Sequence, residues 1–244
     1  MPSDTYDEIE SRKVFTPSGC FRDHFKIMTQ IPKIYGAYVG PNAVDAKLSE
    51  CIMMAVNSAN QCPYCTELHG ELSRLADVQK QGQDILQSDS VTAVQKVAPN
   101  PSVLFARKFG ENSGRGAELD AEYKSLQQSV GPKKAASVYA LCWFLHWGSI
   151  SGNTLNHFLF RSLVGKAKQG ANVLFLGIFA LYYIICYGLV KLTSMMFKLF
   201  PRIPPAFSAA IGVVLCTVAS LWILPLGIIG GLLYPVLGNG PNVM

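Results

Sequence analysis

The last third of the chain limits most tightly what this protein can fold into. Residues 161–244 contain no Asp or Glu, and within them residues 172–190 and 206–237 carry no charged side chain. Each run is long enough to cross the roughly 30 Å hydrocarbon core of a bilayer as a helix. We therefore predict a transmembrane hairpin over residues 170–238. The alternative is that these runs are buried helices of a protein core.

The second apolar run carries small residues at regular spacing. Ser208, Gly212, Cys216 and Ser220 recur every four residues, which places them on one face of a helix. Such a face suits close packing against another helix, although small residues can equally face lipid. The run exceeds a single span, which allows a tilted helix or a break at Pro225.

The charge balance favours a membrane partner over a nucleic-acid partner. The formal net charge of +5 comes from the C-terminal third, while the first 160 residues are close to neutral. No Lys/Arg-rich run interleaved with aromatic residues supports nucleic-acid binding. The flanking basic residues do not decide the orientation of the hairpin. The acidic N-terminus has no apolar run, so it predicts neither a secretory signal nor a transit peptide.

The first part of the chain predicts an all-α domain. We expect an arm over residues 1–40 and a helical domain over residues 41–165, because no segment shows sustained alternation of apolar and polar residues. The helical patterns cover residues 43–59, 63–78, 89–97, 101–109, 117–129 and a long stretch from Pro132. The seven cysteines are too scattered for a disulfide scaffold, which indicates a reducing side of the membrane.

Four side chains in this domain have the spacing of a redox site. Cys62, Cys65 and His69 share one face of a helix, and Glu50 precedes them on another helical pattern. Cys62 lies at the expected helix N-terminus, where the partial positive charge favours a thiolate. His69 is placed to take a proton from Cys65, directly or through water, and Glu50 to orient His69. The position at the helix N-terminus favours Cys62 as the reactive thiol, whereas the nearby base His69 favours Cys65.

Two other interpretations fit the same four residues. Two cysteines, a histidine and a carboxylate can complete a tetrahedral zinc site. The cluster can also be a decayed site that survives as part of the core. A further histidine, His146, lies in a long apolar helix and is expected to be a core residue.

At these residues the chain resembles the alkylhydroperoxidase-D / carboxymuconolactone decarboxylase superfamily. That family carries a Glu followed, twelve residues later, by a Cys-x-x-Cys-x-x-x-His motif, and Glu50, Cys62, Cys65 and His69 match this spacing. The match is specific over residues 44–78, and the arm and the membrane segments lie outside it.

The resemblance implies an all-helical domain that assembles as a trimer or a hexamer, with no bound cofactor or metal. It implies that Cys65 attacks a peroxide, that Cys62 closes a disulfide with it, and that Glu50 and His69 relay the proton. The reductant would be a dithiol, in the family a lipoylated protein acting through an adaptor, and a peroxiredoxin can be a client. The peroxidase form has a histidine between the cysteines, where this chain has Tyr64.

These observations predict a membrane-anchored thiol peroxidase or disulfide oxidoreductase that reduces organic hydroperoxides. The membrane segments are not a usual feature of the family, and they suggest a substrate at the membrane, such as lipid hydroperoxides. The alternative hypothesis is a non-catalytic accessory subunit of a membrane complex, which keeps the domain as a scaffold.

Overall fold

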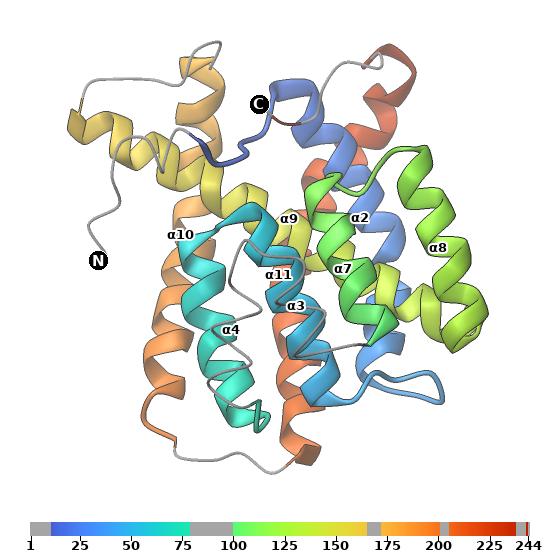
Figure 1. Cartoon of the computed structure of the whole chain (residues 1–244). Helices are drawn as coiled ribbons and strands as arrows, with labels where there is room; N and C mark the ends of the chain where they lie inside the picture. The colour runs from blue at the N-terminus through green and yellow to red at the C-terminus, as the bar shows by residue number, and fades with distance from the viewer. Residues whose placement is uncertain (1–10, 79–99, 165–171, 201–204, 238–242, 244) are drawn as a thin grey trace.

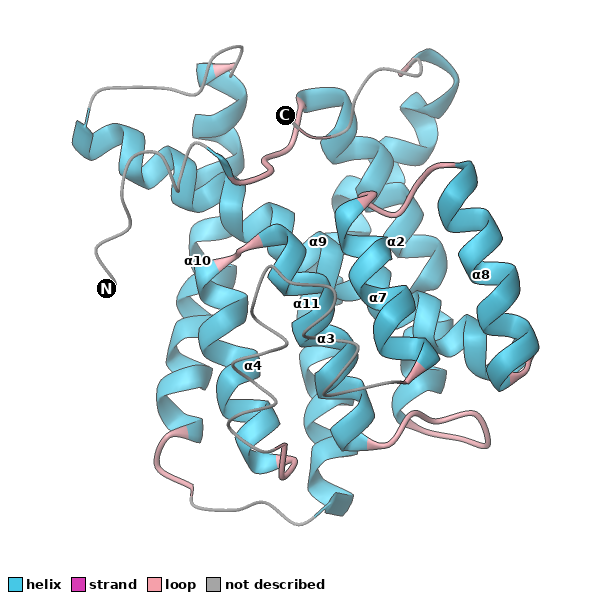
Figure 2. Ribbon diagram, viewed as in Figure 1, coloured by secondary structure: helices cyan, strands magenta, loops and turns pink. Residues whose placement is uncertain are grey.

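The protein is built from α-helices. The computed structural model describes residues 11–78, 100–164, 172–200, 205–237 and 243. Within these ranges it contains no strand, only an isolated bridge between Phe15 and Val243, which confirms the all-α prediction (Figure 2). The helices are α2 (Pro17–Tyr38), α3 (Ala46–Asn60), α4 (Pro63–Leu75), α7 (Pro101–Glu111), α8 (Ala117–Val130), α9 (Pro132–Val164), α10 (Val173–Phe197) and α11 (Pro205–Leu233), followed by a short 3-10 helix over Tyr234–Val236 (Figure 1).

Most of these helices begin where the sequence supplies a cap. Asp45 accepts a hydrogen bond from the backbone N–H of Leu48 at 2.9 Å, and this satisfies a free donor at the start of α3. A proline opens α4, α7 and α9, at a position where its missing N–H is not needed. The helices predicted over residues 43–147 therefore appear with small shifts, while the predicted helix at 89–97 lies outside the described residues.

The N-terminal region differs from the predicted arm. Residues 17–38 form α2, which buries Ile27 and Ile34 completely. The apolar pattern of this helix is interrupted by buried polar side chains, among them Asp23 and His24. Those residues break the periodicity that marks a core helix in the sequence, because their partners lie on other helices.

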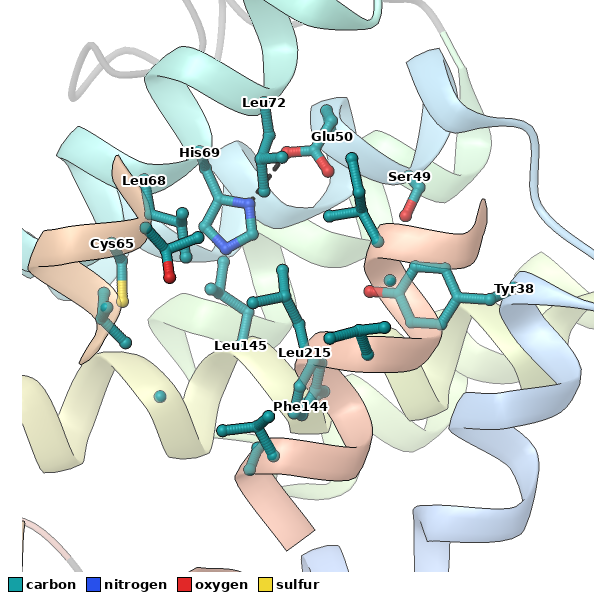
Figure 3. A pocket seen from close by; sticks show the side chains of 18 of the residues that line it. Tyr38, Ser49, Glu50, Cys65, Leu68, His69, Leu72, Phe144, Leu145 and Leu215 are labelled. Carbon is teal, nitrogen blue, oxygen red and sulfur yellow. Dashed lines mark hydrogen bonds and ion pairs between the residues drawn. The ribbon is translucent and has the colours of Figure 1, made fainter. Parts of the chain in front are cut away.

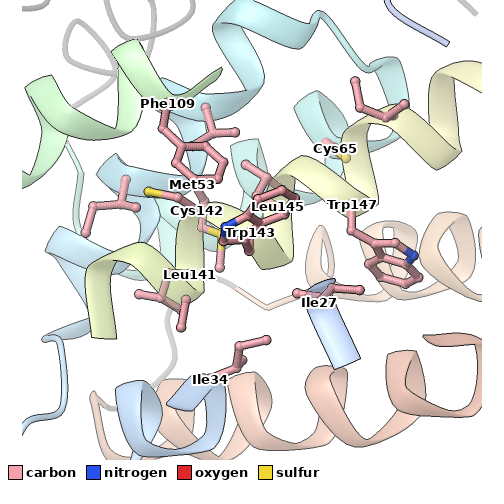
Figure 4. Packing of buried hydrophobic residues seen from close by; sticks show 14 of the residues in the cluster. Ile27, Ile34, Met53, Cys65, Phe109, Leu141, Cys142, Trp143, Leu145 and Trp147 are labelled. Carbon is pink, nitrogen blue, oxygen red and sulfur yellow. The ribbon is translucent and has the colours of Figure 1, made fainter. Parts of the chain in front are cut away.

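Helix α9 is the centre of the core. It contacts α2, α3, α4, α7, α8 and α10. Trp143 of α9 is 1% exposed and packs edge-on against Phe109 of α7, with ring centroids 5.3 Å apart. Ile27 and Ile34 approach from α2, and Trp147 lies further along α9 toward Cys65 (Figure 4). The core is thus one cluster built around the apolar face of a long helix.

The two apolar helices have the length and composition of membrane spans. The candidate spans are Val173–Phe197 and Ala209–Val236, each with a mean hydropathy of 2.3. Helix α11 runs without a break through Pro225. These findings support two spans by length and composition only, so the division into a domain and a separate hairpin stays a prediction.

Helices α10 and α11 pack mainly on the rest of the molecule and touch each other little. Helix α10 lies along α4 and α9, and α11 lies along α2 (Figure 1). Trp147 Nε1 donates to His24 Nε2 at 3.0 Å and to the Tyr183 hydroxyl at 3.2 Å, which ties α9 to α2 and α10. Cys216 of α11 is completely buried.

The small-residue face of α11 packs against α2. A Cβ placed on Gly212 would come within 2.3 Å of the Tyr38 ring, and one on Gly230 within 2.2 Å of the Phe21 carbonyl oxygen. Cys216 and Ser220, from the predicted stripe, are both buried. The close packing predicted for this face is therefore made within the chain.

The opposite faces of α10 and α11 are apolar and exposed. On α10 and α11 the exposed large hydrophobic residues include Leu174, Ile178, Leu181, Ile185, Leu192, Val214, Leu221, Ile228 and Leu232. Contiguous apolar surface of this kind marks contact with a membrane or another protein.

Candidate thiol site

The two cysteines of the predicted motif lie at the start of α4. Cys62 is the N-cap residue, and its Sγ accepts a hydrogen bond from the backbone N–H of Cys65 at 3.4 Å. Asn57 of α3 fixes this turn, because its Oδ1 accepts from the N–H of Cys62 at 3.2 Å and its Nδ2 donates to Thr66 Oγ1 at 2.8 Å. These hydrogen bonds fix Cys62 at the N-terminus of α4.

Two glycines of α9 face the thiols, and one of them, Gly152, makes room for Cys62. A Cβ on Gly152 would come within 2.7 Å of Cys62 Sγ, whereas one on Gly148 would lie 4.0 Å from Cys65 Sγ. The glycines are four residues apart, so they lie one turn apart on the same face of α9. Tyr187 of α10 closes the site, and its hydroxyl donates to the Gly148 carbonyl oxygen at 2.5 Å.

His69 and Glu50 form a pair beside the thiols. His69 Nδ1 lies 2.8 Å from Glu50 Oε2, and both side chains are nearly buried. This pairing brings α3 and α4 together at the position expected from the sequence. With Nδ1 directed at a carboxylate, Nε2 is the nitrogen free to exchange a proton in the pocket.

A large apolar pocket opens beside Cys65 and His69. Its volume is about 670 Å³, and its lining includes Cys65, His69 and Glu50 but not Cys62. Figure 3 shows the Cys65 sulfur and the His69 ring pointing into the pocket, with a dashed line joining His69 to Glu50. Helices α10 and α11 supply about half of the lining, so the pocket depends on the two apolar helices.

The Cys65 thiol is protonated at rest. Its hydrogen bond with the Cys62 side chain and its burial raise the pKa of Cys65 well above the ordinary thiol value. The described contacts do not include a hydrogen bond between Cys65 and His69. Proton transfer between the two side chains therefore needs a water molecule or a bound substrate in the pocket.

Tyr64, the residue between the cysteines, turns away from the pocket. Its ring packs against Tyr187 of α10, with centroids 5.0 Å apart. It does not line the pocket. The residue that differs from the family's pattern thus serves the contact between α4 and α10.

The described residues hold no group of three or more His, Cys, Asp or Glu side chains arranged to bind a metal ion. The four side chains of the motif are therefore not arranged as the ligands of a zinc ion in the described residues. The other cysteines are free as well, and among them Cys51 is only partly buried.

Several residues of the site were not predicted from the sequence. Asn57 gave no signal, because a lone amide in a helical run has many possible roles. Gly148 and Gly152 were detectable in principle, since two glycines one turn apart in a long apolar helix indicate close packing. Tyr187 lies in a predicted span, and its position at the thiols depends on how α10 packs.

His146 is a core histidine, as predicted. It is completely buried, and its Nε2 lies 3.7 Å from Asp23 Oδ2. Arg115 binds the other oxygen of the same carboxylate. This cluster joins α2 to α9 and to the loop before α8, and it lies outside the pocket lining.

Comparisons with protein-family models, with curated proteins and with solved structures find no match to this chain.

Proposed function

We propose that this protein is a membrane-anchored thiol peroxidase of the alkylhydroperoxidase-D type, which reduces organic hydroperoxides through Cys62 and Cys65. The observation that carries the proposal is the pocket, in which Cys65 lies at an apolar wall together with the His69–Glu50 pair. Cys62 is one turn away on α4 and is shielded from the pocket. This arrangement supports Cys65 as the peroxide-facing thiol and Cys62 as the resolving thiol.

The reaction proceeds in two steps. The Cys65 sulfur attacks the terminal peroxide oxygen, the O–O bond breaks, and the products are an alcohol and a Cys65 sulfenic acid. The Cys62 sulfur then attacks the Cys65 sulfur, releases water and forms a disulfide. A dithiol reductant restores both thiols and is itself oxidised to a disulfide. A lipoylated protein or a peroxiredoxin system are the partners that the resemblance suggests.

His69 and Glu50 move the proton. Because the pKa of Cys65 is raised, the thiol must lose its proton as the hydroperoxide binds. His69 Nε2 takes this proton through the bound hydroperoxide or a water molecule and returns it to the leaving alkoxide. Glu50 orients the imidazole through its contact with Nδ1.

The accessory-subunit hypothesis has less support. Two features favour it, a small-residue stripe on α11 that could dock on another protein and Tyr64 in place of the motif's histidine. Gly212 and Cys216 of that stripe, however, are packed within the chain against α2. Assembly as a trimer or hexamer, with the domain on a reducing side of the membrane, remains part of the proposal.

The test uses the full chain in detergent or nanodiscs, with cumene hydroperoxide and a chemical dithiol. We expect wild-type protein to consume peroxide continuously. Cys65→Ser should abolish consumption, and Cys62→Ser, reduced beforehand and assayed without the dithiol, should consume one equivalent and stop at a sulfenic acid. Equal, full activity of both variants would exclude this pair as the redox centre.

A further inference from the structure

The pocket beside Cys65 extends well beyond the thiols. Its lining continues from α4 across α9 to Phe207 and Val218 of α11. A volume of about 670 Å³ lies within the roughly 300–1,000 Å³ that small-molecule pockets span. A small hydroperoxide would leave most of this apolar space unfilled, so the pocket is built for a larger apolar ligand.

The pocket reaches the surface at the two apolar helices. Leu189 of α10 and Phe207 and Val214 of α11 line it and are 42%, 62% and 59% exposed. These rim residues are continuous with the exposed apolar faces of the same helices. If those faces contact lipid, the rim opens toward hydrocarbon.

Two lysines lie near the part of α10 that lines the pocket. Lys198 Nζ binds Glu67 Oε1 at 2.9 Å, and Lys191 binds the same carboxylate. Lys191 lies in the C-terminal half of α10 and Lys198 caps its C-terminus, and this half of the helix also lines the pocket. Charged side chains gather near the ends of a membrane span. The pocket therefore lies near the membrane interface and away from the bilayer centre.

The pocket also has a polar end, away from the thiols. Ser49 is 2% exposed and lines the pocket, and its hydroxyl interacts with that of Tyr38, which also lines it. Figure 3 shows Ser49 and the Tyr38 hydroxyl on the side of the pocket away from Cys65. A buried hydroxyl costs free energy unless it is hydrogen-bonded. A ligand with an oxygen atom at this second position can join the hydrogen bonding of these two hydroxyls.

We propose that this pocket binds the oxidised acyl chain of a membrane lipid, which enters sideways from the bilayer between α10 and α11. The inference rests on the proposed peroxidase function and identifies its substrate class as long-chain lipid hydroperoxides. A hydroperoxide group is costly in hydrocarbon, so an oxidised chain gains by placing it beside Cys65 and His69. The rest of the chain packs on the apolar lining.

The test compares substrates on the full chain in phospholipid nanodiscs. The three substrates are a phospholipid hydroperoxide, a free fatty-acid hydroperoxide and cumene hydroperoxide. Leu215→Trp fills the pocket, because Leu215 lines it on α11. Leu221→Trp is the matched control, since Leu221 is 66% exposed on the same helix and does not line the pocket.

We expect Leu215→Trp to lower the rate with a lipid hydroperoxide by about ten-fold or more relative to the rate with cumene hydroperoxide. Leu221→Trp should leave the ratio of the two rates unchanged. If the rate falls with only one of the two lipid hydroperoxides, that lipid, phospholipid or free fatty acid, is the source of the bound chain. An equal loss with all three substrates, or no loss with any, overturns the inference.

A binding measurement separates this inference from the proposed function. Cys65→Ser protein is titrated with a hydroxy fatty acid, the stable reduction product, in competition with a fluorescent fatty acid. We expect binding, weakened about ten-fold by Leu215→Trp. If the lipid binds but the wild-type protein consumes no peroxide, the lipid site is supported and the peroxidase proposal is refuted. Absence of lipid binding would overturn the lipid site, whatever the result with cumene hydroperoxide.

Discussion

At the scale of single residues, the space around the thiols is set by glycines of α9. Gly152 leaves no room for a side chain, since a Cβ there would meet Cys62 Sγ at 2.7 Å and the Tyr187 ring at 3.0 Å. Gly148 has room, because its nearest neighbour is Cys65 Sγ at 4.0 Å. The site therefore depends on one residue of α9 that makes no polar contact.

This difference predicts opposite effects of two similar changes. Gly152→Ala should destabilise the protein by about 1–3 kcal/mol through overpacking, while Gly148→Ala should be neutral or stabilising. Both changes give the helix the same propensity gain of about 1 kcal/mol, so their difference isolates the clash. Unfolding midpoints in the same detergent measure it. Equal midpoints would mean that Cys62 and Tyr187 do not hold these positions.

The raised pKa of Cys65 makes the role of His69 depend on pH. A raised thiol pKa means that Cys65 is protonated near neutral pH and loses its proton only as the pH rises. His69→Ala should therefore lower peroxide consumption near neutral pH by about 10²–10⁴-fold.

The deficit of His69→Ala should shrink as the pH approaches the thiol pKa, where hydroxide replaces the base. Rate–pH profiles of wild-type and variant protein measure this. A deficit that stays constant across the profile would point to a structural role of His69.

At the scale of helices, the packing of α11 on α2 depends on close backbone approach. Gly230→Ala should weaken it, because the new Cβ would lie 2.2 Å from the backbone oxygen of Phe21, and backbone cannot move aside as a side chain can. Gly188→Ala on α10 has nothing within 4 Å and is the control.

We expect Gly230→Ala to lower stability by about 1–3 kcal/mol and to make the junction of α11 and α2 sensitive to proteolysis. Limited proteolysis and thermal unfolding compare the two variants. Identical behaviour would argue that α11 lies apart from α2, as in a free hairpin.

The buried carboxylate of Asp23 ties α2 to α9 in a pH-dependent way. Burial raises the pKa of Asp23, but the contacts with His146 and Arg115 outweigh it and leave the pKa below its ordinary value. Its stabilising contribution is therefore present above the unfolded-state pKa of about 3.9 and is lost as the pH falls through the lower, folded value.

Asp23→Asn should accordingly destabilise the protein near neutral pH by about 3–5 kcal/mol, because Arg115 and His146 lose a charged partner. The stability of the variant should also fall less steeply in acid than that of wild-type protein. Denaturant titrations between roughly pH 3 and 7 measure both effects. If the free energy of unfolding fell equally with pH in both proteins, Asp23 would be excluded as the titrating group.

The elements that the sequence predicts well are those with local signals. Helices α3, α4 and α9 carry caps, an opening proline and a regular apolar pattern, and these features act within a few residues. Helix α2 was missed because its buried polar groups Asp23 and His24 are satisfied only by residues far along the chain. The contribution of α10 to the thiol site was not predicted either, because Tyr187 reaches Cys62 and Gly148 only through tertiary packing.

At the scale of the whole molecule, the two apolar helices support both the pocket and a membrane contact. Ile185 of α10 is 65% exposed and belongs to the proposed lipid-facing surface. An Arg at such a position costs about 2.5–3.5 kcal/mol in lipid and little in water.

Ile185→Arg should therefore reduce recovery of the protein with vesicles in a flotation gradient. Gln128→Arg, on the exposed polar face of α8, adds the same charge and serves as the control. Equal flotation of both variants would contradict lipid contact along α10.

The redox role of Cys62 and Cys65 can be tested by mapping which cysteines a hydroperoxide oxidises. Reduced full-length protein is treated with one equivalent of hydroperoxide, its free thiols are blocked, and its peptides are mapped by mass spectrometry. We predict a disulfide between Cys62 and Cys65, with partly buried Cys51 unchanged. Oxidation of Cys51 with Cys62 and Cys65 still reduced would contradict the account, because the pocket would then not direct peroxide to the pair.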